Sequence, residues 1–317
     1  MSNVLFVSQN PLERAENLKA VWDAFEGAKT FRHGVYGMSS AERDGFDVVV
    51  CDCLPVIIEG KRRVKSVNIG HGITGDKLYG LDEGRKPWVS PVAFSQTDYA
   101  IAASEASVPM VAGQLGILEE RALPLGFPRT DRYFGTFPEP TVRTYLYAPT
   151  FRNGDGRLPR IDWDAVDNLL SDDELLIVKR HYATPEPVVG RNYPHVMEVP
   201  PTERSTAYLA ACSVVITDYS SIMFDGYILG KPSVLLIDDM EEYLKKRGMY
   251  RDYPIGYSSR WLVAEGNEER LVNELREAAV SGMRNIERRC LDEVAGACDG
   301  HSTERVCKLV EDLLEGR

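Results

Sequence analysis

The segment Thr217-Asp218-Tyr219-Ser220-Ser221 carries the clearest chemical signal in the sequence. An apolar run ends at Thr217, and an amphipathic helical pattern begins directly after the two serines. The start of a helix offers unpaired backbone N–H groups and the positive end of the helix dipole, and serine hydroxyls add further donors. Residues of these types in this order can therefore bind the oxygen atoms of a phosphate. The alternative is that Ser220 only caps the helix.

Lys179-Arg180-His181 place three potential cations directly after the apolar run 174–178. Such a group can neutralise a pyrophosphate and stabilise the charge that develops as a phosphate bond breaks. Adjacent side chains cannot all point in one direction, so at least one of the three is expected to face away, and Lys179 is the weakest candidate. The alternative is a solvated loop.

Arg152 and Asp225 are further candidates. Arg152 follows Pro149-Thr150 directly after another apolar run, and it can bind a phosphate or a carboxylate. A surface ion pair is the alternative for this side chain. Asp225 lies on the first turn of the helix after the serines, where it can bind a ligand hydroxyl or simply favour the helix N-terminus through the dipole. Asp218 can likewise do no more than orient the neighbouring backbone.

His71 lies between Gly70 and Gly72, directly after the apolar run 64–69. The flanking glycines let the backbone turn sharply and let a ligand approach closely. A histidine with an ordinary pKa of ~6.5 can act as a general base on a hydroxyl at neutral pH. A purely structural role is the alternative, and the position at the end of a predicted strand favours the catalytic one.

Short apolar runs alternate with helical patterns from one end of the chain to the other, which indicates parallel sheets with crossover helices. In such sheets ligands bind beyond the carboxyl ends of the strands. The four polar clusters all follow predicted strands, so we expect them at the ligand-binding edges. The predicted strands are 4–7, 46–51, 64–69, 99–103, 121–125, 144–148, 174–179, 213–217, 233–237 and 261–264, and the clearest predicted helices are 162–171, 202–211, 221–229 and 268–280.

The pattern breaks at Gly135-Thr136-Phe137-Pro138-Glu139-Pro140, and a new strand follows. We therefore predict two domains, 1–138 and 139–317. After about residue 266 the chain is almost wholly helical and charged, and we assign these helices to the second domain. The fold class is α/β: two Rossmann-like doubly wound domains with a helical C-terminal tail describe the GT-B fold, in which a ligand binds in a cleft between the domains. A three-layer single domain with a long insertion is the alternative.

Composition restricts the function classes further. The 317 residues carry a net charge of -11, which argues against a nucleic-acid-binding face. The chain begins with a predicted strand rather than a signal peptide, and no apolar run reaches the ~20 residues that span a bilayer. The six cysteines form no CxxC pair, so we expect a cytoplasmic protein without a zinc site. The basic run Lys61-Arg62-Arg63-Val64-Lys65 predicts a solvated turn, with contact to an anionic membrane surface as the minor interpretation.

Several motifs together resemble one family, the CDP-glycerol glycerophosphotransferases of teichoic-acid and capsule synthesis. They occur in the family's order from about residue 64 to 310. The matching segments are His71-Gly72-Ile73-Thr74 (the family's His-Gly-Thr-Pro), Leu125-Gly126-Phe127-Pro128-Arg129-Thr130-Asp131, Tyr147-Ala148-Pro149-Thr150-Phe151-Arg152, Thr217 to Asp225 continued by Leu229-Gly230-Lys231-Pro232, and Asp299-Gly300-His301-Ser302 with Arg305.

The resemblance implies an enzyme that transfers glycerol phosphate, or a similar polyol phosphate, from a CDP-linked donor to a hydroxyl acceptor and releases CMP. We expect no tightly bound cofactor or metal, because the sequence has no zinc spacing and no paired-aspartate motif at a strand end that clearly marks a magnesium site. The acceptor would be lipid-linked or a polymer or oligosaccharide, reached in the cytoplasm or at the inner face of the plasma membrane. His71 would be the general base. By the same resemblance His181, Ser220 and Ser221 would hold the donor pyrophosphate. From the residue types at the strand ends we add Arg152, Lys179, Arg180, Thr217, Asp218 and Asp225 to the donor side, and we expect Gly72, Thr74 and Arg129 on the acceptor side.

The sequence also departs from the family pattern. Ile73-Thr74 replace Thr-Pro, Tyr182 follows His181 where the family has proline, and the long extra N-terminal domain of polymerase members has no counterpart. These departures favour a compact enzyme with a different acceptor or polyol. A nucleotide-sugar glycosyltransferase or epimerase on the same fold is the first alternative, and it would place a carboxylate against the donor ribose. A non-catalytic binding subunit is the second, and the intact His71 argues against it.

Overall fold

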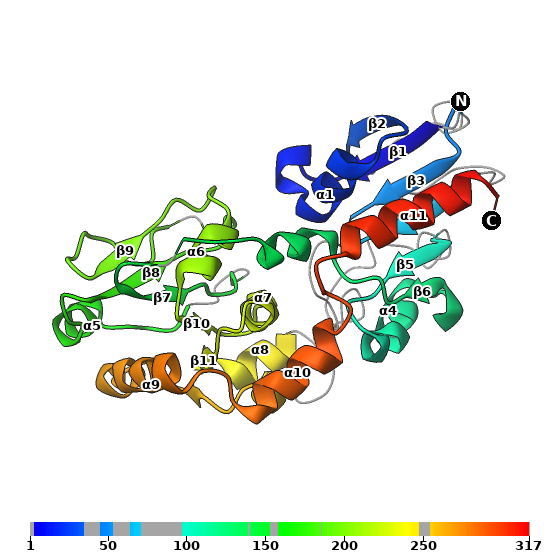
Figure 1. The fold of residues 1–317 in the computed structure, drawn as a ribbon. Helices are drawn as coiled ribbons and strands as arrows, with labels where there is room; N and C mark the ends of the chain where they lie inside the picture. The colour runs from blue at the N-terminus through cyan, green and yellow to red at the C-terminus, as the bar shows by residue number, and fades with distance from the viewer. Residues whose placement is uncertain are drawn as a thin grey trace. The chain divides into compact units, whose positions relative to one another are not determined.

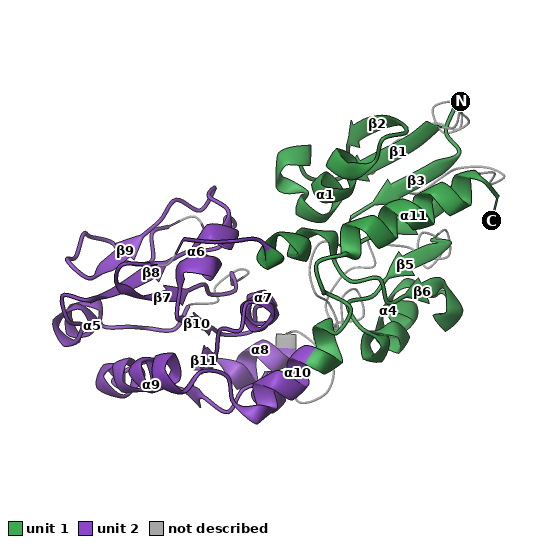
Figure 2. Cartoon of the chain, viewed as in Figure 1, with its two compact units in different colours: residues 1–134, 292–317 green, residues 135–291 purple. Residues whose placement is uncertain are grey.

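The chain forms two compact units, each built around its own parallel sheet (Figure 2). Unit 1 comprises Met1–Phe134 and Asp292–Arg317, and unit 2 comprises Gly135–Leu291. The computed structural model of the protein describes residues 3–34, 45–52, 64–70, 97–138, 140–152, 158–184, 186–246 and 254–316. The two sheets confirm the prediction of two doubly wound α/β domains.

Unit 1 contains a parallel sheet of six strands in the order β2-β1-β3-β4-β5-β6. Figure 1 labels β1, β2, β3, β5 and β6 of this sheet. All four residues of β3 are buried, as expected for a central strand covered on both faces. The strands are β1 Asn3–Ser8, β2 Ala28–His33, β3 Val48–Cys51, β4 Lys65–Asn68, β5 Tyr99–Ile101 and β6 Ala122–Leu123. The helices of this unit are α1 Glu16–Ala24, α4 Val108–Leu115 and α11 Ser302–Leu314, with short 3-10 helices at Leu12–Arg14, Glu105–Ser107, Glu119–Arg121 and Pro128–Phe134.

Unit 2 contains a second six-stranded parallel sheet, in the order β12-β11-β10-β7-β8-β9. Apolar side chains of α5 and α9 pack with those of the central strands in one continuous core. The strands are β7 Arg143–Tyr147, β8 Glu174–Val178, β9 Val196–Glu198, β10 Val214–Thr217, β11 Ser233–Leu236 and β12 Trp261–Leu262. The helices are α5 Trp163–Leu169, α6 Ser205–Ala211, α7 Ile222–Ile228, α8 Met240–Lys246, α9 Glu268–Ser281 and α10 Asn285–Ala295, with a 3-10 helix at Ile255–Tyr257. Helix α10 runs across the boundary into unit 1.

The C-terminal helix belongs to unit 1, whereas the sequence analysis assigned all of 139–317 to the second domain. The apolar side of α11 explains the difference, because Val306 and Val310 are fully buried. They lie in a helix that packs against α1 and β3. The predicted boundary at 138 lies close to the observed one, which falls between Phe134 and Gly135.

Two segments that resemble family motifs hold α11 in place. The Asp131 carboxylate accepts hydrogen bonds from the backbone N–H groups of Ser302 (3.0 Å) and Thr303 (2.7 Å), so it caps the start of the helix. Arg305 Nε donates to the Leu125 carbonyl oxygen at 2.9 Å. Gly126 has φ +77°, and an added Cβ would lie 2.2 Å from a backbone oxygen of the opposing segment. Only glycine fits this approach.

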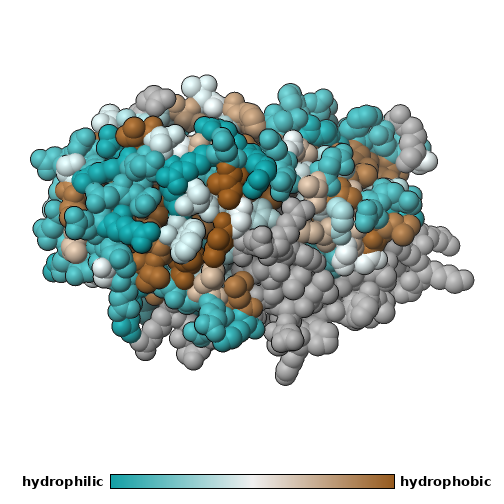
Figure 3. Space-filling view, turned by 90° about the horizontal axis from the view of Figure 1, so that it is seen from below, coloured by the Kyte–Doolittle hydropathy of each residue, from teal (hydrophilic) through white to brown (hydrophobic). Residues whose placement is uncertain are grey.

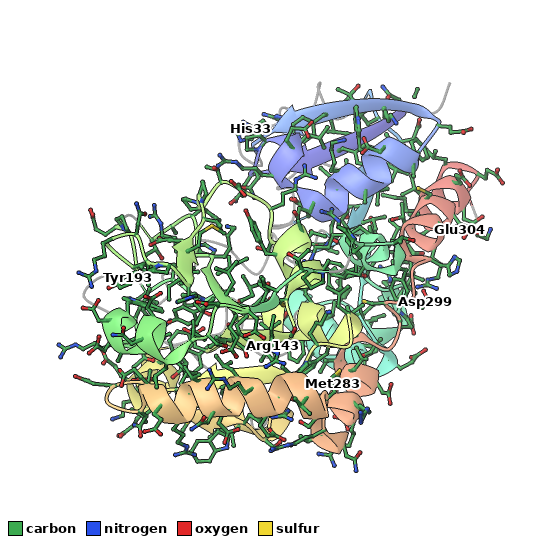
Figure 4. All side chains as sticks on the ribbon, turned by 60° about the vertical axis from the view of Figure 1, so that its left-hand side comes forward. His33, Arg143, Tyr193, Met283, Asp299 and Glu304 are labelled. Atoms are coloured by element: carbon green, nitrogen blue, oxygen red, sulfur yellow. The ribbon has the colours of Figure 1, made fainter. Side chains whose placement is uncertain are left out.

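The connection between α10 and α11 is tied down by the same arginine. Arg305 Nη1 donates to Asp299 Oδ2 at 3.0 Å, and Nη2 donates to Oδ1 at 2.7 Å. Figure 4 shows Asp299 in this connection and Glu304 on α11 just beyond it. The hydrogen bonds from Arg305 outweigh the opposing effect of burial and lower the pKa of the Asp299 carboxyl to about 2. The closing motif therefore has a clear structural role within unit 1.

Glu174, at the start of β8, ties the sheet of unit 2 to the helix α9. Its carboxylate accepts hydrogen bonds from Tyr145 Oη (2.6 Å), Ser171 Oγ (2.8 Å) and Arg276 Nη2 (2.6 Å). Burial by itself would raise the pKa of this carboxyl, but the hydrogen bonds from Arg276, Tyr145 and Ser171 lower it to about 2. The carboxylate therefore stays ionised in the folded protein under mildly acidic conditions.

Glu174→Gln is expected to make the stability of unit 2 less sensitive to acid. A carboxyl whose pKa falls on folding stabilises the protein above its unfolded value, and this contribution is lost as the pH falls towards about 2. The unfolding free energies of wild type and variant should therefore converge by about 1–2 kcal/mol between pH ~6 and ~3.5, since the half-exposed Arg276 screens part of the effect. Urea titrations at both pH values measure this convergence. A difference that is the same at both pH values would contradict the role of Glu174.

Candidate functional site

Four neighbouring strands of unit 2 end at one edge of its sheet, in the order β11-β10-β7-β8. All of them run parallel, so the segments that follow them meet at this edge. These segments carry Arg152 after β7, Lys179-Arg180-His181 after β8, and Asp218 to Ser221 after β10. The topology thus brings the predicted donor-side clusters to neighbouring strand ends.

Thr217 and Asp218 form the frame of the loop after β10. Thr217 Oγ1 donates to the Ala148 carbonyl oxygen at 2.7 Å, and the residue is fully buried. The Asp218 carboxylate is also fully buried, and it accepts from the backbone N–H groups of Thr150 (2.8 Å) and Tyr219 (2.6 Å). These contacts match the interpretation in which Asp218 orients the surrounding backbone. Direct contact of either side chain with a ligand stays a prediction.

Ser220 and Ser221 differ in how their hydroxyls are used. Ser220 Oγ accepts a hydrogen bond from Ile222 N at 3.4 Å, which is a weak capping contact. Ser221 is the N-cap residue of α7, yet its side chain makes no capping hydrogen bond. Helix α7 has only seven residues, so its dipole is small and the hydroxyls matter more. Both serines are half-buried, and Ser221 is the better candidate for a ligand contact.

Asp225 lies inside unit 2, with 2% of its surface exposed. It occupies the first turn of α7, where a carboxylate interacts favourably with the N-terminal end of the helix. That interaction is one of the two roles that the sequence allowed. A hydrogen bond from Asp225 to a ligand hydroxyl stays a prediction.

The three potential cations after β8 make separate contacts. Lys179 is buried, and its Nζ donates to the Pro201 carbonyl oxygen at 3.0 Å. Arg180 Nε lies 2.9 Å from Glu198 Oε1 in an ion pair. Two of the three charges are thus in contact with groups of unit 2 itself, and His181 is the member best suited to meet a ligand.

The ring of His181 is held in a defined orientation. It stacks on Phe151 with ring centroids 4.7 Å apart, and Tyr182 lies on it at 4.3 Å. The backbone N–H of Ala183 donates to His181 Nδ1 at 3.1 Å. Because Nδ1 accepts this bond, the neutral imidazole carries its proton on Nε2. His181 can therefore offer an N–H donor to a phosphate oxygen in its neutral form as well as in its charged form.

Arg152 binds carboxylates of the protein. Its Nη1 lies 2.8 Å from Asp218 Oδ2, and its Nε lies 2.7 Å from Asp239 Oδ2, while only 6% of its side chain is exposed. Burial by itself would lower the pKa of the guanidinium, but Asp218 and Asp239 raise it above its ordinary value. The sequence allowed a phosphate or a carboxylate partner, or a surface ion pair. The structure gives a buried pair with two carboxylates.

His71, Gly72 and Thr74 lie outside the described residues, and hydrogen bonds from Asn17 hold the backbone that leads to them. Asn17 Nδ2 donates to the carbonyl oxygens of Ile69 (3.2 Å) and Gly70 (3.0 Å). Asn17 Oδ1 accepts from the backbone N–H of Arg129 at 2.9 Å, so the predicted acceptor-side residue Arg129 is tied to the same asparagine. Gly70 adopts φ +57°, where glycine is favoured. Sequence reasoning missed Asn17, because one polar residue in an amphipathic helix gives no signal.

Asp239 was also missed, although a signal for it exists. It follows the buried strand β11, and residues after strand ends were the basis for finding the other clusters. The same rule, applied to β11, indicates Asp239. Its carboxylate accepts hydrogen bonds from both Nε (2.7 Å) and Nη2 (3.0 Å) of Arg152.

Two further properties bear on the site. Within the described ranges, no cluster of three or more His, Cys, Asp or Glu side chains is arranged to hold a metal ion. The helices in this part of the chain include none with the length and apolar character needed to cross a membrane. The face in Figure 3 shows hydrophilic residues over much of its described surface, with hydrophobic residues interspersed.

A family model described as CDP-glycerol:poly(glycerophosphate) glycerophosphotransferase matches residues 35–312. Among curated proteins, the teichoic acid ribitol-phosphate primase of Bacillus spizizenii is 27% identical over 290 residues, which cover 81% of this chain and 72% of the primase. The teichoic acid glycerol-phosphate primase of Bacillus subtilis is 23% identical over 278 residues, which cover 82% and 71%. A ribitol-phosphate polymerase of Staphylococcus aureus is 23% identical, and the match covers only 42% of its length.

Solved structures show the same fold. A structure of the wall teichoic acid polymerase TagF superposes with a TM-score of 0.80 at 17% identity, covering 99% of this chain and 89% of that one. A putative UDP-N-acetylglucosamine 2-epimerase from Listeria monocytogenes superposes with a TM-score of 0.62 at 12% identity, covering 100% and 98%. These likenesses confirm the predicted GT-B fold class.

Proposed function

Because the chain belongs to the CDP-glycerol:poly(glycerophosphate) glycerophosphotransferase family, we propose that it transfers a polyol phosphate from a CDP-linked donor to a hydroxyl group in teichoic-acid-type synthesis. The observation that carries the proposal is the match over residues 35–312, which includes every motif that resembled the family in the sequence. The primases similar to this chain are named for glycerol phosphate and for ribitol phosphate, so the polyol is one of this class.

The proposed reaction is an in-line displacement at phosphorus. His71 takes the proton from the acceptor hydroxyl, and the oxygen attacks the phosphorus that bears the polyol. The bond from this phosphorus to the bridging oxygen breaks, and CMP leaves with that oxygen. Such transfers need little covalent chemistry from the protein, and they depend on positioning and on neutralisation of phosphate charge.

The donor diphosphate is proposed to bind Ser220, Ser221 and His181. Support comes from the Ser221 hydroxyl, which makes no capping hydrogen bond, and from the orientation of His181, which places its proton on Nε2. We propose a supporting role for Thr217, Asp218, Lys179 and Arg180, because they precede these residues in the same loops and contact other groups of unit 2. On the acceptor side the proposed residues are Gly72, Thr74 and Arg129.

Release of the nucleotide product tests the function directly. The protein is incubated with CDP-glycerol, CDP-ribitol or UDP-N-acetylglucosamine together with a teichoic-acid primer, and the nucleotide released is identified. Release of CMP that requires the primer supports the proposal. Release of UDP, or epimerisation of the UDP-sugar, would assign the chain to the nucleotide-sugar enzymes that share its fold. Binding of a CDP-linked donor without turnover would indicate a non-catalytic subunit.

The acceptor is proposed to be a lipid-linked or polymeric chain of the teichoic-acid type. Support comes from the relatives, which are named as primases and polymerases of teichoic acid. Access to such an acceptor would place the protein in the cytoplasm or at the inner face of the membrane, with the basic run that includes Lys65 as a weak contact. Sedimentation with anionic vesicles at low and high salt measures that contact.

We expect activity to survive removal of divalent metals. The donor phosphates are proposed to bind hydroxyl and imidazole donors, so the transfer does not require a tightly held ion. Dialysis against EDTA followed by the CMP-release assay measures this dependence. Lasting inactivation that one divalent ion reverses would show that the proposal omits a metal.

A further inference from the structure

Arg152 is the centre of a cluster that joins the ends of three neighbouring strands. Nη1 of its guanidinium donates to the Thr150 carbonyl oxygen at 2.7 Å and lies 2.8 Å from the Asp218 carboxylate. Its Nε and Nη2 donate to the two carboxylate oxygens of Asp239, at 2.7 and 3.0 Å. The side chain therefore spans the segments that follow β7, β10 and β11.

Two tyrosines complete the cluster. The rings of Tyr219 and Tyr243 stack with centroids 4.0 Å apart and planes 14° apart. The guanidinium carbon of Arg152 lies 5.2 Å from the first ring centroid and 5.1 Å from the second. Tyr219 Oη also donates to Asp239 Oδ1 at 3.1 Å. Arginine is suited to this place, because a planar guanidinium can bind a carboxylate with two nitrogens and contact aromatic rings as well.

This geometry fixes the loop that carries the two serines. Tyr219 precedes Ser220 directly, and both its ring and its hydroxyl are held within the cluster. Asp218 holds the backbone one residue earlier. The position of the loop from 218 to 221 therefore depends on contacts with Asp239, in the segment after β11, and with Tyr243 on α8.

We propose that Arg152, Asp239, Tyr219 and Tyr243 form a clasp with Asp218 that positions Ser220 and Ser221 for the donor, so that Arg152 is a positioning residue and not a phosphate ligand. The inference rests on the proposed donor site. All three guanidinium nitrogens contact protein oxygens, and the one positive charge faces two carboxylates. An arriving phosphate would meet a cluster with a net negative charge, which disfavours direct binding.

Asp239→Asn separates the two roles of Arg152 by the sign of its effect. If Arg152 were a phosphate ligand, weakening its pair with Asp239 would free the guanidinium, and CDP would bind equally well or more tightly. If the clasp positions the serine loop, CDP affinity should fall by about three- to ten-fold, as expected for one charge-assisted hydrogen bond. Calorimetric titration of CDP measures the difference. Affinity equal to or above that of wild type would overturn the proposal.

Asp238→Asn is the matched control, because Asp238 is the neighbouring residue and loses the same charge. Its carboxylate accepts from the backbone N–H groups of Ala264 (3.0 Å) and Glu265 (3.3 Å), a segment outside the clasp. Burial raises the pKa of the Tyr147 hydroxyl, and the negative charges of Asp218, Asp238 and Asp239 raise it further. The charge of Asp238 therefore acts on the same part of unit 2 as the charge of Asp239. CDP should bind this variant as tightly as wild type, or slightly more tightly. A loss equal to that of Asp239→Asn would overturn the clasp.

Two more variants keep the inference testable if Asp239→Asn unfolds. Tyr219→Phe keeps the stacked ring and removes only the hydroxyl bond to Asp239, so CDP affinity should fall by about two-fold. Arg152→Lys keeps the charge but cannot bind a carboxylate with two nitrogens, so its loss should match that of Asp239→Asn and should add little to it in the double variant. Additive losses in the double variant would show that Arg152 acts independently of Asp239.

Ser221→Ala distinguishes a failure of this inference from a failure of the proposed function. If Ser221→Ala leaves CDP affinity unchanged, the donor site has been assigned wrongly, and the clasp loses the role proposed for it. If Ser221→Ala weakens CDP while Asp239→Asn does not, the donor site stands and the clasp alone is refuted. Thermal melting of each variant confirms that the comparison is made between folded proteins.

Discussion

Replacing His71 with alanine is expected to lower turnover by ~10²-fold or more while CDP binding stays close to that of wild type. The imidazole is proposed to take the proton of the acceptor hydroxyl, and a methyl group cannot do so. Donor affinity should be retained, because the residues proposed to bind the diphosphate lie in unit 2 and His71 is not among them. CMP release under saturating donor measures turnover, and calorimetry with CDP measures binding.

The pH dependence of kcat/KM gives a second test of His71 as the base. An imidazole must be neutral to accept a proton, so kcat/KM of the wild type should fall on the acid side of its pH profile. The residual activity of His71→Ala should lack this acid limb. His301→Ala is the control, since His301 is an exposed histidine at the start of α11 and should give wild-type turnover. Turnover of His71→Ala equal to that of the wild type would sink the assignment of the base.

Ser221→Ala is expected to weaken donor binding by roughly ten-fold to more than a hundred-fold, which corresponds to ~1.5–3 kcal/mol for a hydrogen bond to a charged oxygen. The Ser221 hydroxyl makes no capping bond to α7, so its loss should not remove a stabilising contact of the helix. The weakening should be similar for CDP and for the complete donor, because both carry the diphosphate. Calorimetric titration gives the affinities directly.

Titration with CMP distinguishes diphosphate binding by Ser221 from a purely structural role of the serine loop. It lacks the second phosphate, so its binding should suffer much less from Ser221→Ala. Equal weakening of CMP and CDP would mean that the serine loop shapes the nucleoside pocket instead of binding the diphosphate. Ser213→Ala is the matched control, because Ser213 precedes β10 and therefore lies at the opposite end of the same strand. It should leave both affinities unchanged.

The apolar runs predicted the inner strands of both sheets and the edge strands β6 and β12, but not β2 or β9. These two strands lie at the edges of their sheets. Strand β2 has the sequence AKTFRH with none of its residues fully buried, and β9 has only three residues. An edge strand is partly solvated and pairs on one side only, so it does not need a continuous apolar run. Its position depends on backbone pairing with a neighbour that lies elsewhere in the sequence.

The local sequence pattern also did not show which of the two sheets the C-terminal helix α11 packs on. The amphipathic sequence of α11 predicts a helix with one buried side, but not which sheet covers that side. The contacts that decide it join Asp131 to Ser302 and Leu125 to Arg305, residues 171 and 180 positions apart. Both segments were recognised as family motifs, yet their mutual contact became evident only from the structure.

The sequence likewise predicted only part of the candidate site. The rule that ligands lie beyond strand ends correctly brought Arg152, His181 and the serine loop to one sheet edge. It could not show that Arg152 pairs with Asp218 and Asp239, because residue type gives the charge of a side chain but not its partner. A buried charge is paired in most proteins, so carboxylates after neighbouring strands deserve the same weight as the cations.

Because unit 1 is built from two separate parts of the sequence, its folding during synthesis on the ribosome is delayed. Unit 2 is encoded within one uninterrupted stretch, 135–291, and all of its strands and core leave the ribosome before α11 does. Unit 1 begins first but buries Val306 and Val310 of α11 in its own interior. The N-terminal unit is therefore the last to be completed, and a nascent chain must carry an unfinished apolar surface through the synthesis of the whole of unit 2.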